Sequence, residues 1–139
     1  MEVQKQVSPL KKSGCGKIAG IFFLIIFLVG GSLLWWNFFY VYGEGVKSGE
    51  LNYLVKKGNV FKTYEGKLIQ SGLRAGAPGS VQSYEFEFSV ADDSIANVLM
   101  NNSGQYFDLH YREYKRSVAW RGYTRYIVDK IIRMKPIER

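Results

Sequence analysis

The chain has 139 residues, with 19 Lys and Arg against 12 Asp and Glu, and a formal net charge of +7. Hydrophobic residues make up 47% of the sequence and aromatic residues 16%, which is too apolar for a disordered chain and too aromatic for a coiled coil. This length suits one domain rather than two. The single cysteine excludes an intramolecular disulfide and a cysteine-cluster metal site.

A long uncharged segment near the amino terminus is the strongest signal in the sequence. No charged residue occurs from Ile18 to Gly43, and residues 21–29 have no polar face. A helix needs about 20 mainly apolar residues to cross a bilayer core about 30 Å thick. We therefore predict a transmembrane helix over 18–42, between a basic tail at 1–17 and a folded domain at 43–139. The alternative, a buried core helix, is disfavoured because the remaining chain is too short to enclose it.

The flanks of this segment predict its orientation. Four lysines precede it, whereas Glu44 is the first charge after it, so the positive-inside rule puts the amino terminus in the cytoplasm. The folded domain is then periplasmic, and an exported domain without paired cysteines fits a bacterial inner membrane. Bulky tryptophans follow the apolar core where a signal peptide would have small residues, which favours an uncleaved anchor. The residues expected at the membrane–water interfaces are Lys17, Trp35, Trp36, Tyr40 and Tyr42.

Period-two alternation dominates the rest of the chain and predicts five strands. They are expected at 49–56, 60–69, 84–90, 105–114 and 122–128, with a bulge or bend at Gly66 and a loop at 71–83. A helix capped by Asp92 or Asp93 is expected between the third and fourth strands. This order predicts a small mainly-β domain, specifically an OB-like five-stranded barrel with one helix. An SH3-like barrel is the alternative.

A search for catalytic chemistry finds little. His110, the single histidine, shares a strand face with Asp108 and Arg112, and a polar surface is favoured over an acid–base pair because no nucleophile accompanies it. The alternating acids Glu85 and Glu87 are expected on the solvent face of a strand. We therefore predict no catalytic residues, no metal site and no cofactor, and a protein that is not an enzyme.

A cluster of basic and aromatic residues near the carboxyl terminus is the best candidate for ligand binding. Guanidinium groups beside aromatic planes suit sugars, phosphates or single-stranded nucleic acid. A periplasmic location disfavours nucleic acid and favours an anionic glycan or a phosphate-bearing envelope ligand. Anionic lipid headgroups or an acidic partner protein are the alternatives. The candidate residues are Arg112, Arg116, Trp120, Arg121 and Arg125.

Several short segments resemble an uncharacterised group of short, single-pass bacterial envelope proteins. The similarity covers most of residues 43–128. Some members carry the name 6-phosphogluconate dehydrogenase, which these residues contradict because the chain holds no soluble nucleotide-binding unit and is too short for one plus a substrate domain. The segments are Lys47-Ser48-Gly49-Glu50-Leu51, Lys56-Lys57-Gly58, residues 61–68, Glu87-Phe88-Ser89-Val90, His110-Tyr111 and Trp120-Arg121-Gly122-Tyr123-Thr124.

The anchor, the small β domain and the absence of a catalytic motif lead to two functional hypotheses. The first is a non-enzymatic, membrane-anchored interaction domain, an accessory subunit of a bacterial envelope or inner-membrane protein complex. The second is a binding domain for an anionic glycan or a phosphate-bearing envelope ligand. Both imply the lipid bilayer as a partner, and the first also implies a larger membrane protein complex.

Overall fold

The computed structural model describes residues 14–70 and 84–137, and forms two compact units, Met1–Leu34 and Trp35–Arg139. The predictions for the first thirteen residues of the tail, including three of its lysines, and for the loop at 71–83 lie outside the described residues. All distances below are between residues of the same unit.

The apolar segment forms a single helix, α1 (Cys15–Phe38). None of its residues is buried, and its most apolar stretch has a mean hydropathy of 2.5. At about 1.5 Å per residue the helix is roughly 36 Å long, which is sufficient to cross a bilayer core. The predicted helix is therefore confirmed as an element long and apolar enough to span a membrane. It ends at Phe38, so Tyr42, which we had placed within the span, lies in the first strand instead.

The second unit is mainly β, as predicted, with one helix between its third and fourth strands. The elements are β1 (Val41–Lys57), β2 (Thr63–Gln70), β3 (Tyr84–Val90), α2 (Asp93–Asn101), β4 (Tyr106–Tyr114) and β5 (Tyr126–Lys135). Asp92 caps α2, because its carboxylate accepts hydrogen bonds from the backbone N–H groups of Ser94 and Ile95 at 2.7 and 3.1 Å.

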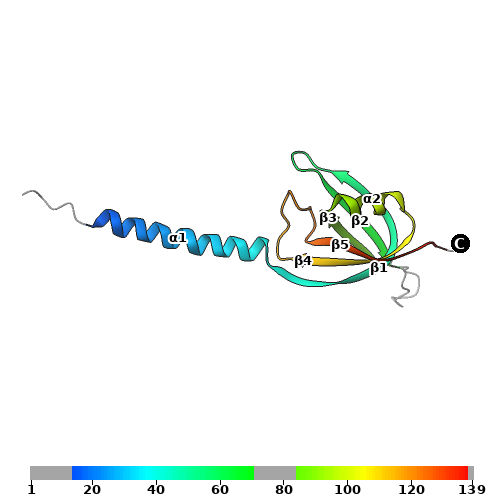
Figure 1. Ribbon diagram of the computed structural model, residues 1–139, viewed down its shortest axis with the longest axis horizontal. Helices are drawn as coiled ribbons and strands as arrows, with labels where there is room; N and C mark the ends of the chain where they lie inside the picture. Colours follow the sequence, from blue (N-terminus) through cyan, green and yellow to red (C-terminus); the bar gives the residue numbers. More distant parts are fainter. Residues whose placement is uncertain (1–13, 71–83, 138–139) are drawn as a thin grey trace, which may run out of the picture. The chain divides into compact units, whose positions relative to one another are not determined.

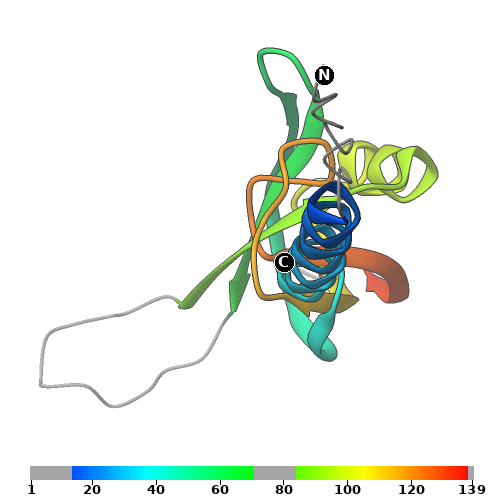
Figure 2. The ribbon, with the colours of Figure 1, turned by 90° about the vertical axis from the view of Figure 1, so that its left-hand side faces the viewer.

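The strands pair in a closed order, β1-β2-β3-β5-β4, with β4 returning to β1 (Figure 1). All neighbours are antiparallel except β3 and β5, which are parallel. β1 is long enough to pair with β4 along its first half and with β2 along its second. The β3–β5 ladder has two residue pairs, Ser89 with Ile127 and Val90 with Val128. The side-by-side course of β2 and β3, with α2 beyond them, is visible in Figure 2.

The core lies inside this closed sheet. Alternate residues of every strand point inward, as the period-two pattern requires. α2 contributes Ala96 and Leu99 and packs against β1, β3 and β5. Fully buried side chains from the strands include Leu51, Leu68, Phe88, Phe107, Leu109 and Val128. The interior is therefore a single apolar cluster shared by all five strands and one helix face.

Four local predictions are wrong. The first strand begins at Val41 rather than at residue 49, and the second begins at Thr63 rather than at residue 60. The last strand does not begin at residue 122 but at Tyr126, because residues 122–125 belong to the loop that precedes it. Gly66 does not form a bulge; it pairs in register with Leu54 and Phe88, and the bulge lies at Asn52 in β1. Gly66 is needed for packing, since a Cβ there would lie 2.6 Å from the Phe88 ring and 2.7 Å from Leu54 Cδ1.

Gly66→Ala should therefore lower the free energy of unfolding by about 1–3 kcal/mol, because the added methyl group overpacks the core. Unfolding of the full chain in mild detergent, followed by near-ultraviolet circular dichroism against urea, measures this. Gly43→Ala is the matched control, since its Cβ meets only Glu113 Oε2 at 3.8 Å and its effect should stay within about 0.5 kcal/mol. Equal stability of both variants would contradict the packing assigned to Gly66.

Candidate functional site

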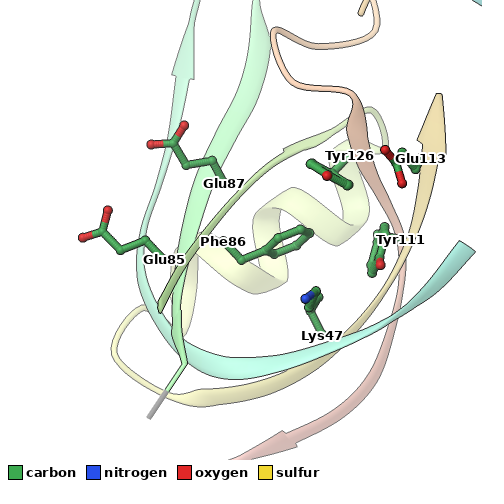
Figure 3. Close-up of a pocket in the computed structure, with 7 residues that line it drawn as sticks. All are labelled: Lys47, Glu85, Phe86, Glu87, Tyr111, Glu113 and Tyr126. Atoms are coloured by element: carbon green, nitrogen blue, oxygen red, sulfur yellow. The ribbon is translucent and has the colours of Figure 1, made fainter. Parts of the chain in front are cut away.

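A cavity of about 450 Å³ opens at one end of the sheet interior, among β1, β3, β4 and β5 (Figure 3). We call it the aromatic pocket. It continues the core, because the inward row of β4 runs from Phe107 and Leu109 to Tyr111 and Glu113. Its volume is in the usual range for ligand pockets. The lining residues are Lys47, Glu85, Phe86, Glu87, Tyr111, Glu113 and Tyr126.

Three aromatic rings form the floor of this pocket. The Phe86 ring centroid lies 5.3 Å from that of Tyr111 and 5.2 Å from that of Tyr126, and the two tyrosine rings meet edge to face at 5.6 Å. Phe86 is buried and stacks on Phe88, which fixes the floor to the core. Such tilted ring contacts are favourable and directional. The floor is therefore a rigid apolar surface carrying two phenol groups.

The charged groups of the pocket fall into two sets. Lys47 Nζ lies 5.7 Å from the Phe86 ring centroid, a cation–π distance, although Lys47 occupies an inward position of β1 where an apolar residue would be usual. Glu113 is the last residue in the inward row of β4, which begins at Phe107. The Glu85 and Glu87 carboxylates point away from the rings (Figure 3). One cation and one carboxylate thus accompany the aromatic floor.

Glu85 and Glu87 belong to the solvent face, as expected from the sequence. Lys67 Nζ lies 2.7 Å from Glu85 Oε2 and 3.2 Å from Glu87 Oε1. Hydrogen bonds to Glu85, which has the larger effect, and to Glu87 raise the pKa of Lys67 to about 12. A pKa raised by folding means that these ion pairs stabilise the fold below pH 10.5 and lose this effect as the pH rises through 12.

The five predicted ligand residues do not share one pocket. Arg112 Nε pairs with Asp129 Oδ2 at 2.9 Å on the outer face of the sheet. Arg125 Nη2 lies 3.9 Å from Glu113 Oε1, at the limit of an ion pair. Arg116 and Trp120 are exposed in the loop between β4 and β5, where the Trp120 ring meets the Phe61 ring edge-on at 6.3 Å.

Arg121 is engaged by its own chain rather than exposed to a ligand. Its Nη1 donates to the Phe38 carbonyl at 2.9 Å, its Nη2 donates to the Arg116 carbonyl at 3.1 Å, and its guanidinium lies 3.6 Å from the Tyr114 ring centroid. Burial lowers the pKa of Arg121 below its ordinary value. Phe38 ends α1, so this contact satisfies a carbonyl that the helix itself leaves without a partner.

Four of the five predicted interface residues lie at the end of α1 or soon after it. The Trp36 ring stacks on Tyr40 at 4.2 Å, and Lys115 Nζ lies 5.2 Å from the Trp36 ring. Trp35 is exposed, and Tyr42 is exposed in β1. Lys17 belongs to the other unit, where it lies in the first turn of α1 and is exposed.

A buried carboxylate that sequence reasoning missed fixes the β4–β5 loop. Glu65 is 5% exposed and accepts hydrogen bonds from Thr63 Oγ1 at 2.7 Å, Ser89 Oγ at 2.6 Å and the Tyr123 N–H at 3.0 Å. Gly122 packs on Ser89 so closely that a Cβ there would lie 2.2 Å from Ser89 Cβ. The loop is thereby held against the outer face of β2 and β3. The spacing of these residues gives no signal of the contact.

The partner of His110 is Asp129 rather than Asp108. His110 Nδ1 and Asp129 Oδ1 are 2.5 Å apart, and Asp108 instead lies 3.8 Å from Arg133. Asp129 is skipped in the β4–β5 ladder, and this bulge turns its carboxylate toward His110. Among residues 14–70 and 84–137 no group of three side chains suited to a metal ion occurs.

Comparisons of the chain with protein-family models, with curated proteins and with solved structures find no match. The function must therefore be argued from this chain's own helix, pocket and charges.

Glu65→Ala should lower the free energy of unfolding by about 2–4 kcal/mol, because three donors, two of them buried, lose their acceptor. It should also release the β4–β5 loop, so the Tyr123 and Thr124 amides should exchange hydrogen faster. Hydrogen exchange of the full chain in detergent, read by mass spectrometry, measures this. Glu87→Ala is the matched control on the neighbouring strand and should leave exchange at 122–125 unchanged. Protection of those amides in Glu65→Ala would rule out this role.

Proposed function

We propose that this protein is a non-enzymatic interaction domain anchored in the bacterial inner membrane, serving as an accessory subunit of an envelope or inner-membrane protein complex. The aromatic pocket is the observation that carries this proposal. Interaction hot spots are rigid aromatic surfaces in desolvated pockets with charged or polar groups nearby. The floor of Phe86, Tyr111 and Tyr126, with Lys47 and Glu113 beside it, has this composition.

The pocket suits a protein segment that inserts one large apolar side chain. An aromatic or long aliphatic group would cover the three rings, while a neighbouring carboxylate of the partner would pair with Lys47 and a neighbouring cation with Glu113. The rings are held by the core, so little conformational freedom would be lost on binding.

The strand order supports an OB-like fold over the SH3-like alternative. Five strands in the order β1-β2-β3-β5-β4, a parallel β3–β5 contact and a helix between β3 and β4 are the features on which this proposal depends. Proteins of this class bind on a face of β2 and β3 and on the loops beside it. Here the β4–β5 loop lies on the outer face of those strands, so the aromatic pocket is the better candidate for binding.

Location and orientation are part of the proposal. The length and apolarity of α1 support an anchor, and the lysines before it, against Glu44 after it, support a cytoplasmic amino terminus and a periplasmic β domain. The second candidate function is a binding domain for an anionic glycan or a phosphate-bearing ligand. Its support is the exposure of Arg116 and Trp120 in one loop.

The docking role is tested by affinity purification of the full chain in mild detergent with quantitative mass spectrometry. A partner should be recovered in stoichiometric amount, and Tyr126→Ser should reduce its recovery at least tenfold, because a central ring of the pocket is lost. Tyr123→Ser is the matched control, since Tyr123 is exposed outside the pocket, and it should retain the partner.

Lys47→Glu is a second test that leaves the aromatic floor intact, and it should also reduce recovery. Circular dichroism of each variant establishes that the domain is folded. Recovery of the protein alone, or of the same partner at equal levels with all three variants, would refute the docking role.

The orientation predicts the behaviour of fusions at the carboxyl terminus. Alkaline phosphatase placed there should be active in bacterial cells, because it folds only in an oxidising compartment. Green fluorescent protein exported to the same place should be dark, whereas its fusion at the amino terminus should fluoresce. The full chain should also stay in the membrane fraction after a high-salt wash. The reverse pattern of the two reporters would invert the orientation, and a soluble chain would remove the anchor.

A further inference from the structure

We propose that a basic hollow beside the end of α1 binds the phosphate group of an anionic lipid of the bilayer. This inference rests on the proposed membrane anchor but not on the docking role of the aromatic pocket. The hollow has a volume of about 210 Å³ and lies within the Trp35–Arg139 unit. It is lined by Tyr42, Glu113, Tyr114, Lys115 and Arg125.

The charges of the hollow suit a phosphate. Lys115 and Arg125 supply two cations, and Glu113 is the one carboxylate among the lining residues. Arg125 lies 3.9 Å from Glu113 and its side chain is 53% exposed, so this ion pair is long and its guanidinium is accessible. Short charge-assisted bonds from an arginine fork to phosphate are stronger than such a pair. Tyr42 and Tyr114 add phenol groups, and Tyr42 is 67% exposed.

The position of the hollow favours a lipid as the source of the phosphate. Lys115 Nζ lies 5.2 Å from the ring of Trp36, which belongs to the last turn of α1, and Trp36 stacks on Tyr40. Tryptophan and tyrosine at the end of an apolar helix lie at the level of the lipid headgroups. A cation in contact with Trp36 is therefore at the depth where lipid phosphates occur.

Arg121 holds the hollow at this depth. Its guanidinium binds the Phe38 carbonyl at the end of α1 and lies against the Tyr114 ring, which forms one wall of the hollow. The segment after β4 is thus tied to the last residue of the apolar helix. Arg121 is a positioning residue in this arrangement, because its Nη1 and Nη2 groups donate to backbone carbonyls of its own chain.

The test is native mass spectrometry of the full chain in mild detergent, titrated with phosphatidylglycerol or with phosphatidylcholine of the same acyl chains. The wild-type protein should retain phosphatidylglycerol in preference. Each cation removed from the membrane surface should weaken binding about fivefold. The double variant Lys115→Ala, Arg125→Ala should therefore retain anionic lipid at least tenfold less well.

The matched control is Lys130→Ala, Arg133→Ala, which also removes one lysine and one arginine, here from exposed positions of β5. This control should keep the preference for phosphatidylglycerol. Lys115→Gln, Arg125→Gln repeats the test with longer side chains, and circular dichroism establishes that every variant is folded. Equal retention of the two lipids, or equal losses in both double variants, would overturn the proposal. Displacement of the lipid by inorganic phosphate at the lipid's own concentration would make a soluble phosphate the ligand and overturn the lipid assignment.

Failure here is distinguishable from failure of the anchor. A chain that remains in the membrane fraction but shows no dependence on Lys115 and Arg125 loses only the headgroup site. A chain that is soluble without detergent loses the anchor, and the lipid proposal with it.

Discussion

The closure of the sheet depends on the length of β1, which lets this strand pair with both β4 and β2. This strand pairs with β4 from Val41 to Glu50 and with β2 from Glu50 to Lys57, so Glu50 has a partner in both neighbours. Gly49 lets the β2 backbone approach closely at this point, since a Cβ there would lie 2.7 Å from the Ile69 carbonyl oxygen. Closure gives every strand two neighbours and creates the interior whose open end is the aromatic pocket.

Two contacts fix the long β4–β5 connection. They also explain why Arg121 stabilises the fold whereas Arg125 is accessible to a ligand. The Glu65 carboxylate binds the Tyr123 amide at one place, and the Arg121 guanidinium binds the Phe38 carbonyl at another. The Glu65 carboxylate is buried, and Nη1 and Nη2 of Arg121 donate to backbone carbonyls. Nε of Arg121 is buried without a hydrogen-bond partner among the residues that the structure describes. Arg125 has only a long contact with Glu113 and remains half exposed. Because its internal partner is weak, the Arg125 guanidinium is accessible to a ligand.

Glu113 lines both the aromatic pocket and the basic hollow. It follows Tyr111 on the inward row of β4 and meets Arg125, which in turn lies 6.0 Å from the Tyr126 ring. Under the two proposals, a headgroup that draws Arg125 away from Glu113 would remove the nearby positive charge from this carboxylate. Glu113 would then attract a cation of a docked partner more strongly. Lipid binding and partner binding would then be coupled through one side chain.

The sequence by itself determined the apolar helix, the order of the elements and the inward rows of the strands, because these depend on local periodicity and on runs of apolar residues. It offered Asp92 or Asp93 as the cap of the second helix, and the structure has Asp92 there. It did not reveal the Glu65 contact with the Tyr123 amide, the bulge that turns Asp129 toward His110, or the separation of the five candidate ligand residues. Only the tertiary structure decided these, because each depends on contacts between different elements, and the pairing register that places the elements is set by closure of the whole sheet.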